Sequence, residues 1–210
     1  GLAHAAGALF LCDAVQGYGR VPLPENADLI AISAHKVHGP KGIGALWIRD
    51  GVKLAPLLHG GGQEEPGRSG TLSPALCAGF GAAAKLMRER ADGDRAHVDR
   101  LFALALDRLG PDWTVNGSVA RRYKGNLNIR RSGLDIARLM SDLRDISFSA
   151  GSACASGSGR PSHVLRALGL SDAEARNSIR LGFGRHTTEL ELLAALDRIG
   201  AAAQAQRIAA

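Results

Sequence analysis

Aromatic side chains are scarce in this sequence. Phe, Trp and Tyr together make up 4% of the 210 residues, so few rings are present on which nucleic-acid bases could stack. The formal net charge is +6, but the basic residues are scattered along the chain. Scattered charge is typical of a solvated, arginine-rich surface, and it is also compatible with an anionic cofactor or substrate. We therefore expect no nucleic-acid partner.

Long apolar runs are missing as well. No stretch approaches the roughly 20 consecutive apolar residues that a membrane-spanning helix needs, so no membrane association is expected. Residues 1–16 lack the basic segment that opens a signal peptide, which favours a cytoplasmic protein. The first residue is Gly1 and not Met, so we expect that Gly1 is not the natural beginning.

Cysteine is rare, and its spacing excludes two common uses. The three cysteines form no CxxC pair, and an odd number does not suit a framework of disulfides. Cys12 lies in an apolar run, as structural cysteines do. Cys154 instead lies among Gly, Ser and Ala, which predicts a thiol on an accessible loop. The alternative is an incidental surface cysteine.

The first part of the chain has the pattern of an α/β sheet. Three short apolar runs bounded by Gly, Pro or Asp predict strands at 8–12, 28–33 and 43–48. The connections between them are short for helical crossovers, so some pairings are expected to be antiparallel or non-sequential. A glycine-rich loop follows at 57–71. A helix is then predicted from Ser73-Pro74 to about Arg90, ended by residues 91–94.

The second part has the pattern of a smaller α+β unit, and the boundary is expected between residues 80 and 95. Apolar residues recur at helical spacing from Val98 to Leu109. Strands are predicted at 126–130, 145–151 and 178–184. Helices are predicted at 134–144 and 162–169, and a last one from Thr188, where Glu191 completes a capping box.

Two polar residues follow predicted strands at positions where α/β sheets collect their ligands. Asp13 directly follows the first predicted strand, and Lys36 comes shortly after the second. Taken singly, Asp13 could be a turn or cap residue and Lys36 an ordinary loop lysine. As a pair they match the needs of a pyridoxal phosphate enzyme, whose lysine binds the cofactor and whose aspartate keeps the ring nitrogen protonated.

Two histidines flank this lysine and raise the question of a metal site. His35 and His38 lie close together, but no cysteine or carboxylate in the same stretch completes a ligand set. We therefore expect no catalytic metal here.

Several motifs, in order along nearly the whole chain, resemble the cysteine desulfurases of the class-V aminotransferase family. They read "CDAVQ", "SAHKVHGPKGIGALW", "HGGGQE" with "GRSGT", "SAGSAC" with "PSHVLRALGL", and "NSIRLGFGR". The long segment around Cys154 resembles the NifS/IscS-like subgroup, which serves iron–sulfur cluster assembly. The resemblance implies a fold-type I pyridoxal phosphate transferase. Residues 1–84 would be the C-terminal part of the cofactor-binding large α/β domain, and residues 85–210 the small α+β domain with the catalytic cysteine.

The resemblance also implies how the cofactor would be held. Lys36 would bind pyridoxal 5'-phosphate covalently and later move protons. Asp13 would pair with the pyridinium nitrogen, and Gln16 would hydrogen-bond the phenolic oxygen. Ser33 and His35 would bind the phosphate.

Three further roles follow from the same resemblance. Thr71 would reach the phosphate held by the partner subunit of a homodimer, and Arg180 would clamp the substrate carboxylate, for which a guanidinium fork is suited. Cys154 would take the sulfur of L-cysteine as a persulfide and release L-alanine. It would pass the sulfur to an iron–sulfur scaffold or another acceptor protein, and it could ligate an iron–sulfur cluster transiently.

The sequence departs from the family in length. The family chain is much longer, and we expect the missing part, which would precede Gly1, to supply a phosphate-binding helix N-terminus, a histidine over the ring and several strands. Without it, a sheet with unpaired edges and an uncovered face is expected. Two alternatives to a desulfurase stay open: a non-catalytic fragment or accessory subunit, and a related lyase such as a selenocysteine lyase.

Overall fold

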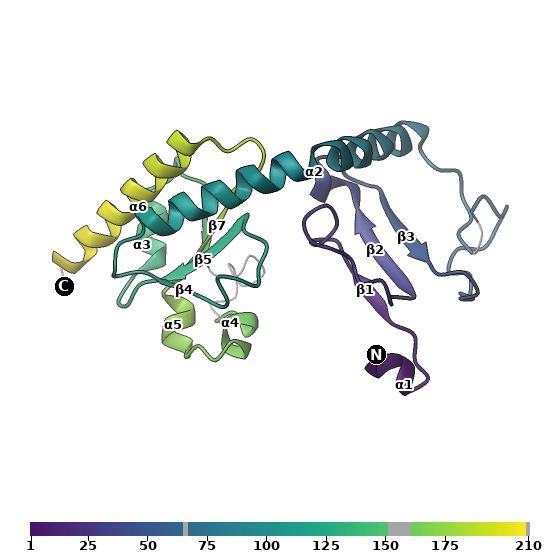
Figure 1. The fold of residues 1–210 in the computed structure, drawn as a ribbon, viewed down its shortest axis with the longest axis horizontal. Helices are drawn as coiled ribbons and strands as arrows, with labels where there is room; N and C mark the ends of the chain where they lie inside the picture. Colours follow the sequence, from purple (N-terminus) through teal and green to yellow (C-terminus); the bar gives the residue numbers. More distant parts are fainter. Residues whose placement is uncertain (65–66, 151–160, 209–210) are drawn as a thin grey trace. The chain divides into compact units, whose positions relative to one another are not determined.

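The computed structural model describes residues 1–64, 67–150 and 161–208. The chain folds into two compact units, residues 1–91 and residues 92–210 (Figure 1). Each unit has its own sheet, and helix α2, Pro74–Arg108, begins in the first unit and ends in the second. The assignment of separate functional domains to residues 1–84 and 85–210 stays a prediction.

The first unit is built on a three-stranded mixed sheet, in which the central strand β2 lies between β1 and β3 (Figure 1). The strands are β1, Leu11–Asp13; β2, Leu29–Ser33; and β3, Gly44–Ile48. β1 and β2 run parallel, and β2 and β3 run antiparallel. Strands β2 and β3 lie where the sequence predicts them, whereas β1 begins three residues later than the strand predicted at 8–12 and includes Asp13. The expectation of an antiparallel pairing across a short connection is confirmed.

Two short elements of this unit have no counterpart in the predicted pattern. Helix α1 covers Leu2–Ala5, and a 3-10 turn, η1, covers Ala34–Val37 directly after β2. Both elements are a single turn long, so neither carries the periodicity from which a helix is predicted.

Helix α2 contradicts the predicted break at residues 91–94. The helix continues without interruption through this stretch. Gly93 costs about 1 kcal/mol relative to Ala in a helix interior, but the guanidinium of Arg185 binds the Asp94 carboxylate, with Nε at 3.0 and 2.9 Å from its two oxygens. The helical spacing predicted from Val98 onward is confirmed. Tertiary packing of this later part outweighs the weak local signal to stop.

The second unit contains a four-stranded antiparallel sheet in the order β4-β5-β7-β6. Its strands are β4, Thr114–Val115; β5, Asn126–Arg130; β6, Ser149–Ala150; and β7, Ser178–Gly182. The strands predicted at 126–130 and 178–184 are confirmed. The strand predicted at 145–151 is shorter, because residues 145–148 do not join the ladder. β4 was not predicted.

Among residues 92–150 and 161–208, four helices follow α2, and side-chain caps start each of them. They are α3, Ile136–Asp142; α4, His163–Ala167; α5, Asp172–Arg176; and α6, Glu189–Ile208. The capping box of α6 is confirmed, because the Thr188 N–H donates to the Glu191 carboxylate at 2.8 Å and the Glu191 N–H donates to the Thr188 hydroxyl at 3.2 Å. α5 was not predicted, although Ser171 and Glu174 form a second such box.

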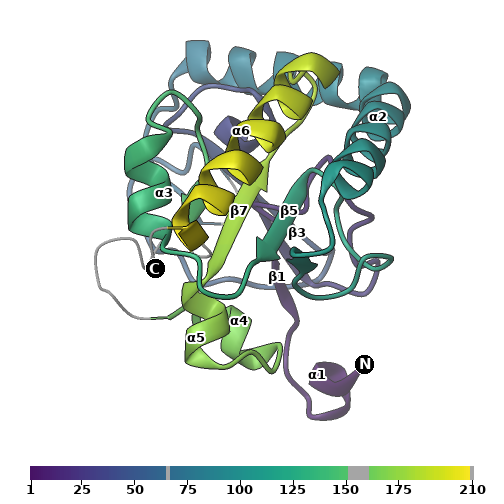
Figure 2. The ribbon, with the colours of Figure 1, turned by 90° about the vertical axis from the view of Figure 1, so that its left-hand side faces the viewer.

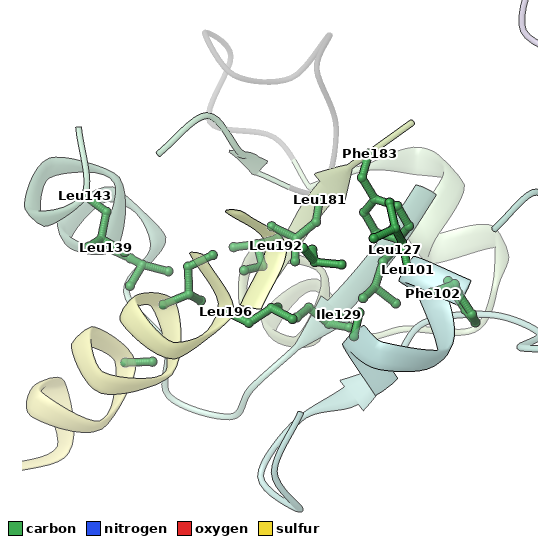
Figure 3. Close-up of a cluster of buried hydrophobic side chains, with 14 of the residues drawn as sticks. Leu101, Phe102, Leu127, Ile129, Leu139, Leu143, Leu181, Phe183, Leu192 and Leu196 are labelled. Carbon is green, nitrogen blue, oxygen red and sulfur yellow. The ribbon is translucent and has the colours of Figure 1, made fainter. Parts of the chain in front are cut away.

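The main hydrophobic core belongs to the second unit. In Figure 2, α6 runs along β7, and α3 packs beside α6. The core side chains come from α2, β5, α3, β7 and α6 (Figure 3), and those with no exposed surface include Leu101, Leu127, Ile129, Leu139 and Ile179. Leu192, Leu196 and Ile199 of α6 are buried as predicted.

The first unit has a thin core by comparison. Its buried apolar residues are mostly small, namely Ala14, Ala27, Leu29, Ala34, Val37 and Ala83. Large side chains on its sheet stay exposed instead: Leu11 is 54%, Leu46 is 44% and Trp47 is 48% exposed. Within the described residues, β1 and β3 each pair on one side only. Among the residues that the structure describes, this sheet therefore has two unpaired edges and exposed apolar side chains.

The carboxylate of Asp28 fastens the chain before β1 to the start of β2. Asp28 is 6% exposed, and its Oδ2 accepts from the Phe10 N–H at 2.7 Å and contacts His4 Nε2 at 2.7 Å. Arg49 Nε lies 3.3 Å from Oδ1. The Phe10 N–H first, and then His4 and the Arg49 charge, lower the pKa of Asp28 below its ordinary value.

We expect Asp28→Asn to lower the free energy of unfolding at neutral pH by removing this anchor. A folded-state pKa below the unfolded value of about 3.9 stabilises the fold fully above that value. The stabilisation is lost as the pH falls through the folded-state pKa, so the difference between variant and wild type should shrink in acid. Urea unfolding of both proteins over a series of pH values measures this difference in the free energy of unfolding. The other carboxylates are the same in both proteins, so their pH dependence cancels in this difference. A difference that stays constant into acid would contradict the lowered pKa of Asp28.

Candidate functional site

The parallel pairing of β1 and β2 brings two strand ends to the same edge of the first unit's sheet. Asp13 is in register with Ala31, and the Ala14 N–H donates to the Ala31 carbonyl at 2.9 Å. Asp13 is exposed, and its Oδ1 accepts from the Val15 N–H at 3.0 Å, which turns the chain at the end of the strand. One carboxylate oxygen is thus used locally, in the turn that follows the strand.

The chain leaves β2 through η1, and Lys36 lies in this turn. Ser33 ends the strand, and its Oγ lies 2.8 Å from Nδ1 of His35, so hydroxyl and imidazole are held side by side. His38 takes a left-handed conformation, with φ of 66°, and ends the turn. The half-buried Lys36 is therefore held by a short, sharply ended turn at the strand end.

Gly44 fixes this turn from the opposite side. It is in register with Ser33 across the β2–β3 pair, and the Ala34 N–H donates to the Ile43 carbonyl at 3.1 Å. A Cβ at position 44 would lie 2.6 Å from the Ile32 carbonyl oxygen, closer than real Cβ atoms come. Only glycine allows this backbone approach beside Ser33.

Arg20 links the turn after β1 to the turn after β2. Its Nη1 donates to the side-chain Oε1 of Gln16 at 2.9 Å and to the Gln16 carbonyl at 3.1 Å. Its Nη2 donates to the Lys36 carbonyl at 2.9 Å. The guanidinium therefore connects the segments that carry two of the predicted site residues.

Thr71 lies in the same unit, at the end of the glycine-rich loop. The loop is held by its own side chains: the Gly62 N–H donates to Ser69 Oγ at 3.1 Å, and the Gly70 N–H donates to Gln63 Oε1 at 2.7 Å. Thr71 is exposed and precedes α2. Thr71 thus follows described loop residues that are tied to one another by hydrogen bonds.

Arg180 lies in the second unit, at the middle of β7. It is half-buried and in register with Asn128 of β5 and Ser149 of β6. Partners in an antiparallel pair share one face of the sheet, so Arg180 lies on the face opposite to Ile179 and Leu181, which are buried in the core.

Buried hydrogen bonds hold this polar face in place. Asn116, 2% exposed, donates to Asn128 Oδ1 at 2.6 Å and to Ser178 Oγ at 2.9 Å, and it accepts from Arg130 at 2.6 Å. Ser178 donates to the Glu174 carbonyl at 2.7 Å. Buried polar groups that satisfy one another specify a single arrangement of the strands next to Arg180.

Cys154 lies outside the described residues. Described residues on either side of it are anchored. Ala150 pairs with Ile179 in the sheet, and the buried Ser162 accepts from the Leu165 N–H at 3.3 Å to cap α4. The predicted role of this cysteine stays a prediction.

The structure thus brings part of the predicted site together. In the first unit, the end of β1 carries Asp13 and Gln16, and the end of β2 carries Ser33, His35 and Lys36. Arg180 belongs to the other unit. Sequence reasoning missed Arg20, although its position four residues after Gln16 is the spacing of neighbours on a helical turn. It also missed Asn116, because a lone Asn in a loop gives no signal of burial.

Two further findings concern residues 1–64, 67–150 and 161–208. No group of three or more His, Cys, Asp or Glu side chains there could hold a metal ion. No helix in these ranges combines the length and the apolar character needed to cross a membrane.

Comparisons with known proteins agree on one family. Residues 1–194 match the family model of aminotransferase class-V. The chain is 48% identical over 190 residues to the mitochondrial cysteine desulfurase of Saccharomyces cerevisiae, covering 87% of this chain and 38% of that protein. It is 44% identical over 191 residues to the cysteine desulfurase IscS of Rickettsia typhi, covering 87% of this chain and 47% of that one.

Solved structures give the same result for the fold. A NifS-like protein from Rickettsia africae matches with a TM-score of 0.83 and 28% identity, covering 96% of this chain and 55% of that one. Another NifS-like protein matches with a TM-score of 0.80 and 29% identity, covering 91% and 51%. The chain spans less than half the length of both curated relatives and about half that of these structures.

We expect Gly44→Ala to disturb the turn that holds Lys36. The added methyl group cannot fit against the Ile32 carbonyl, so the β2–β3 pair must separate beside Ser33. Amide hydrogen exchange of Ala34, whose N–H binds the Ile43 carbonyl, should become faster. Gly182→Ala is the matched control, because Gly182 also lies at the end of a paired strand but has open space around it. Equal effects of the two substitutions on this exchange would contradict the role of Gly44.

Proposed function

Because this chain belongs to the class-V aminotransferase family, we propose that the protein is a pyridoxal-phosphate-dependent cysteine desulfurase that converts L-cysteine to L-alanine. The observation that carries the proposal is the 48% identity over 190 residues to a curated cysteine desulfurase. The match extends over 87% of this chain, so it includes most of both units. The arrangement of Asp13 and Lys36 at neighbouring strand ends supports the same reaction class.

The residues at the edge of the first unit's sheet fit the chemistry of this cofactor. Pyridoxal phosphate, when bound, supplies a protonated ring that accepts electrons from the substrate. Lys36 would provide the amine that binds the cofactor and would move a proton at its Nζ. Asp13 would keep the ring nitrogen protonated, because a negatively charged carboxylate favours a positive charge beside it. Asp13 is exposed at its strand end, so its own charge does not have to be buried without a partner.

Three further residues of this unit would orient the cofactor. The side-by-side hydroxyl of Ser33 and imidazole of His35 would bind its phosphate, and their own 2.8 Å contact fixes their relative orientation. Thr71 would bind the phosphate held by the partner subunit of a homodimer. The self-supported glycine-rich loop holds Thr71 at its end, which supports such a role.

Two residues of the second unit would act on the substrate. Arg180 would bind the carboxylate of L-cysteine with its planar fork of donors. The thiolate of Cys154 would form a bond to the substrate sulfur while the bond between that sulfur and Cβ breaks. The products balance: the enzyme gains a persulfide sulfur, and L-cysteine leaves as L-alanine.

The partners and the location belong to the same proposal. The persulfide on Cys154 would be passed to an iron–sulfur scaffold or another sulfur-acceptor protein, with Cys154 as a transient iron–sulfur ligand. We propose a cytoplasmic homodimer. Mitochondrial desulfurases are among the relatives, so a mitochondrial location is the alternative.

A second candidate function is favoured by the small share of its relatives' length that this chain spans. Because the chain matches 38% and 47% of its two curated relatives, it could act as an accessory or non-catalytic part that does not turn over alone. The exposed Leu11, Leu46 and Trp47 on the sheet of the first unit also favour a chain that needs further cover. A selenocysteine lyase is a related alternative within the same reaction class.

Absorbance spectroscopy and product analysis test the proposal. Protein with pyridoxal phosphate should show an absorbance band that Lys36→Ala abolishes, because the band requires the covalent link to Nζ. Cys154→Ala should keep the band but lose L-alanine production by about a hundredfold or more, since it removes the sulfur acceptor. Leu190→Ala is the control: Leu190 is 82% exposed in the second unit, so band and rate should both be unchanged.

Each alternative has its own outcome. If the 210-residue chain shows no band but gains one when combined with the remaining part of a family enzyme, the accessory function is supported. Pyruvate in place of L-alanine would indicate elimination and not desulfuration. Faster turnover of selenocysteine than of cysteine would favour the lyase. An unchanged desulfuration rate in Cys154→Ala would remove the role of that thiol.

A further inference from the structure

We propose that Arg20 is a positioning residue that fixes the orientation of the Gln16 amide and braces the turn of Lys36. The inference rests on the proposed function, because it assigns Arg20 a purpose at the same cofactor site. Arg20 carries none of the roles that the family resemblance implies. Its guanidinium nevertheless contacts both segments that would hold the cofactor ring.

The contact with Gln16 decides which end of the amide faces a ligand. A guanidinium has five N–H donors and no acceptor, so it can bind only the oxygen of a side-chain amide. Nη1 of Arg20 lies 2.9 Å from Oε1 of Gln16. The NH₂ group of Gln16 therefore lies on the other side of the amide and is presented as a donor. A phenolic oxygen that carries negative charge needs such a donor, and a rotated amide would offer it a second oxygen instead.

The contact with Lys36 braces a turn that is weak by itself. η1 is a single 3-10 turn, and its hydrogen bonds have poorer geometry than those of an α-helix. The N–H groups of His38 and Gly39 both donate to the Ala34 carbonyl, at the start of the turn. The Lys36 carbonyl, near its end, accepts from Nη2 of Arg20 at 2.9 Å. This charge-assisted bond holds the backbone of the residue whose amine would react.

The geometry that lets one side chain reach both segments is built into the fold. Residues 15–20 form turns in which the Tyr18 N–H binds the Ala14 carbonyl at 2.8 Å and the Val21 N–H binds the Gly17 carbonyl at 3.0 Å. Helical spacing brings Gln16 and Arg20 to one side of this segment.

Gly19, beside Arg20, lies close to side chains of two neighbouring elements. Gly19 has a φ of +74°, and a Cβ there would collide with the Met87 side chain and lie 3.4 Å from Val37. Met87 belongs to α2 and Val37 to η1. The segment that carries Arg20 thus passes close to Val37 in the turn of Lys36, and the bond from Arg20 to the Lys36 carbonyl joins the two.

The position of the charge has an expected effect on the cofactor. Arg20 polarises the Gln16 amide, so the NH₂ group becomes a better donor to the phenolic oxygen. A stronger donor would withdraw charge from the phenolic oxygen of a bound cofactor, so that a proton on the Lys36 nitrogen would be held less strongly. Removing Arg20 should therefore raise the pH at which the Lys36-dependent absorbance band changes.

The test uses the full-length holoenzyme with Arg20→Met and Arg20→Lys. We expect Arg20→Met to raise the pH midpoint of the absorbance change by about 0.5–1 pH unit and to weaken pyridoxal phosphate binding about tenfold. Arg20→Lys should lie between wild type and Arg20→Met, because one ammonium group can reach Gln16 or the Lys36 carbonyl but has no fork to bind both. Arg20→Lys also keeps the test decisive if Arg20→Met does not fold.

A double-mutant cycle separates positioning from a merely structural effect. In a Gln16→Leu background, Arg20→Met should shift the midpoint no further, since the amide through which it acts is gone. Arg49→Met is the matched control: Arg49 also binds backbone carbonyls of the first unit, those of Glu25 and Ala27, but lies away from the site. It should lower stability without moving the midpoint.

The outcomes are distinguishable from a failure of the proposed function. Wild-type protein without a Lys36-dependent band contradicts the proposed function and this inference with it. A band whose pH midpoint is the same in wild type and Arg20→Met contradicts the inference alone. An equal shift in the presence and absence of Gln16, or an equal shift in Arg49→Met, also overturns it, because the effect would then not run through the amide.

Discussion

The parallel pairing of β1 with β2 is the constraint on which the rest of the first unit depends. Because the two strands run in the same direction, both end at the same edge of the sheet, and Asp13 and the turn of Lys36 follow at neighbouring strand ends. An antiparallel pairing would place them at opposite edges. The later contacts of Ser33, Gly44 and Arg20 refine an arrangement that this one pairing makes available.

The two units are stabilised by different kinds of interaction. The second unit buries a contiguous set of large apolar side chains between its helices and one face of its sheet. Its other face carries the hydrogen-bonded Asn116, Asn128 and Ser178, so its functional candidate Arg180 lies on a rigid frame. The first unit buries mainly alanines and depends more on polar contacts such as those of Asp28 and Arg20. Its site is therefore held by hydrogen bonds more than by packing.

Much of the fold could be predicted from the sequence, because periodicity reports burial directly. The apolar runs that became β2 and β3 are bounded by Gly and Asp, and the spacing from Val98 to Ala105 marks a helix face that is buried. The break predicted at 91–94 was wrong, because a local signal to stop competes with tertiary contacts that the sequence does not display. The ion pair of Asp94 and Arg185 joins residues far apart along the chain. The site was predicted less completely than the fold. A strand end followed by Asp13 or Lys36 is visible in the sequence. The Arg20 contacts are not, because they depend on a one-turn element and on two loops that approach each other in space, and neither leaves a pattern along the chain.

The open edges of the first unit's sheet have a practical consequence for the isolated chain. β1 and β3 offer unpaired backbone groups within the described residues, and the exposed Leu46 and Trp47 of β3 lie beside one of these edges. Strands with free edges and apolar side chains pair readily with copies of themselves. At high concentration the chain should therefore associate edge to edge. An added polypeptide that pairs with a free edge and extends the sheet would prevent this association.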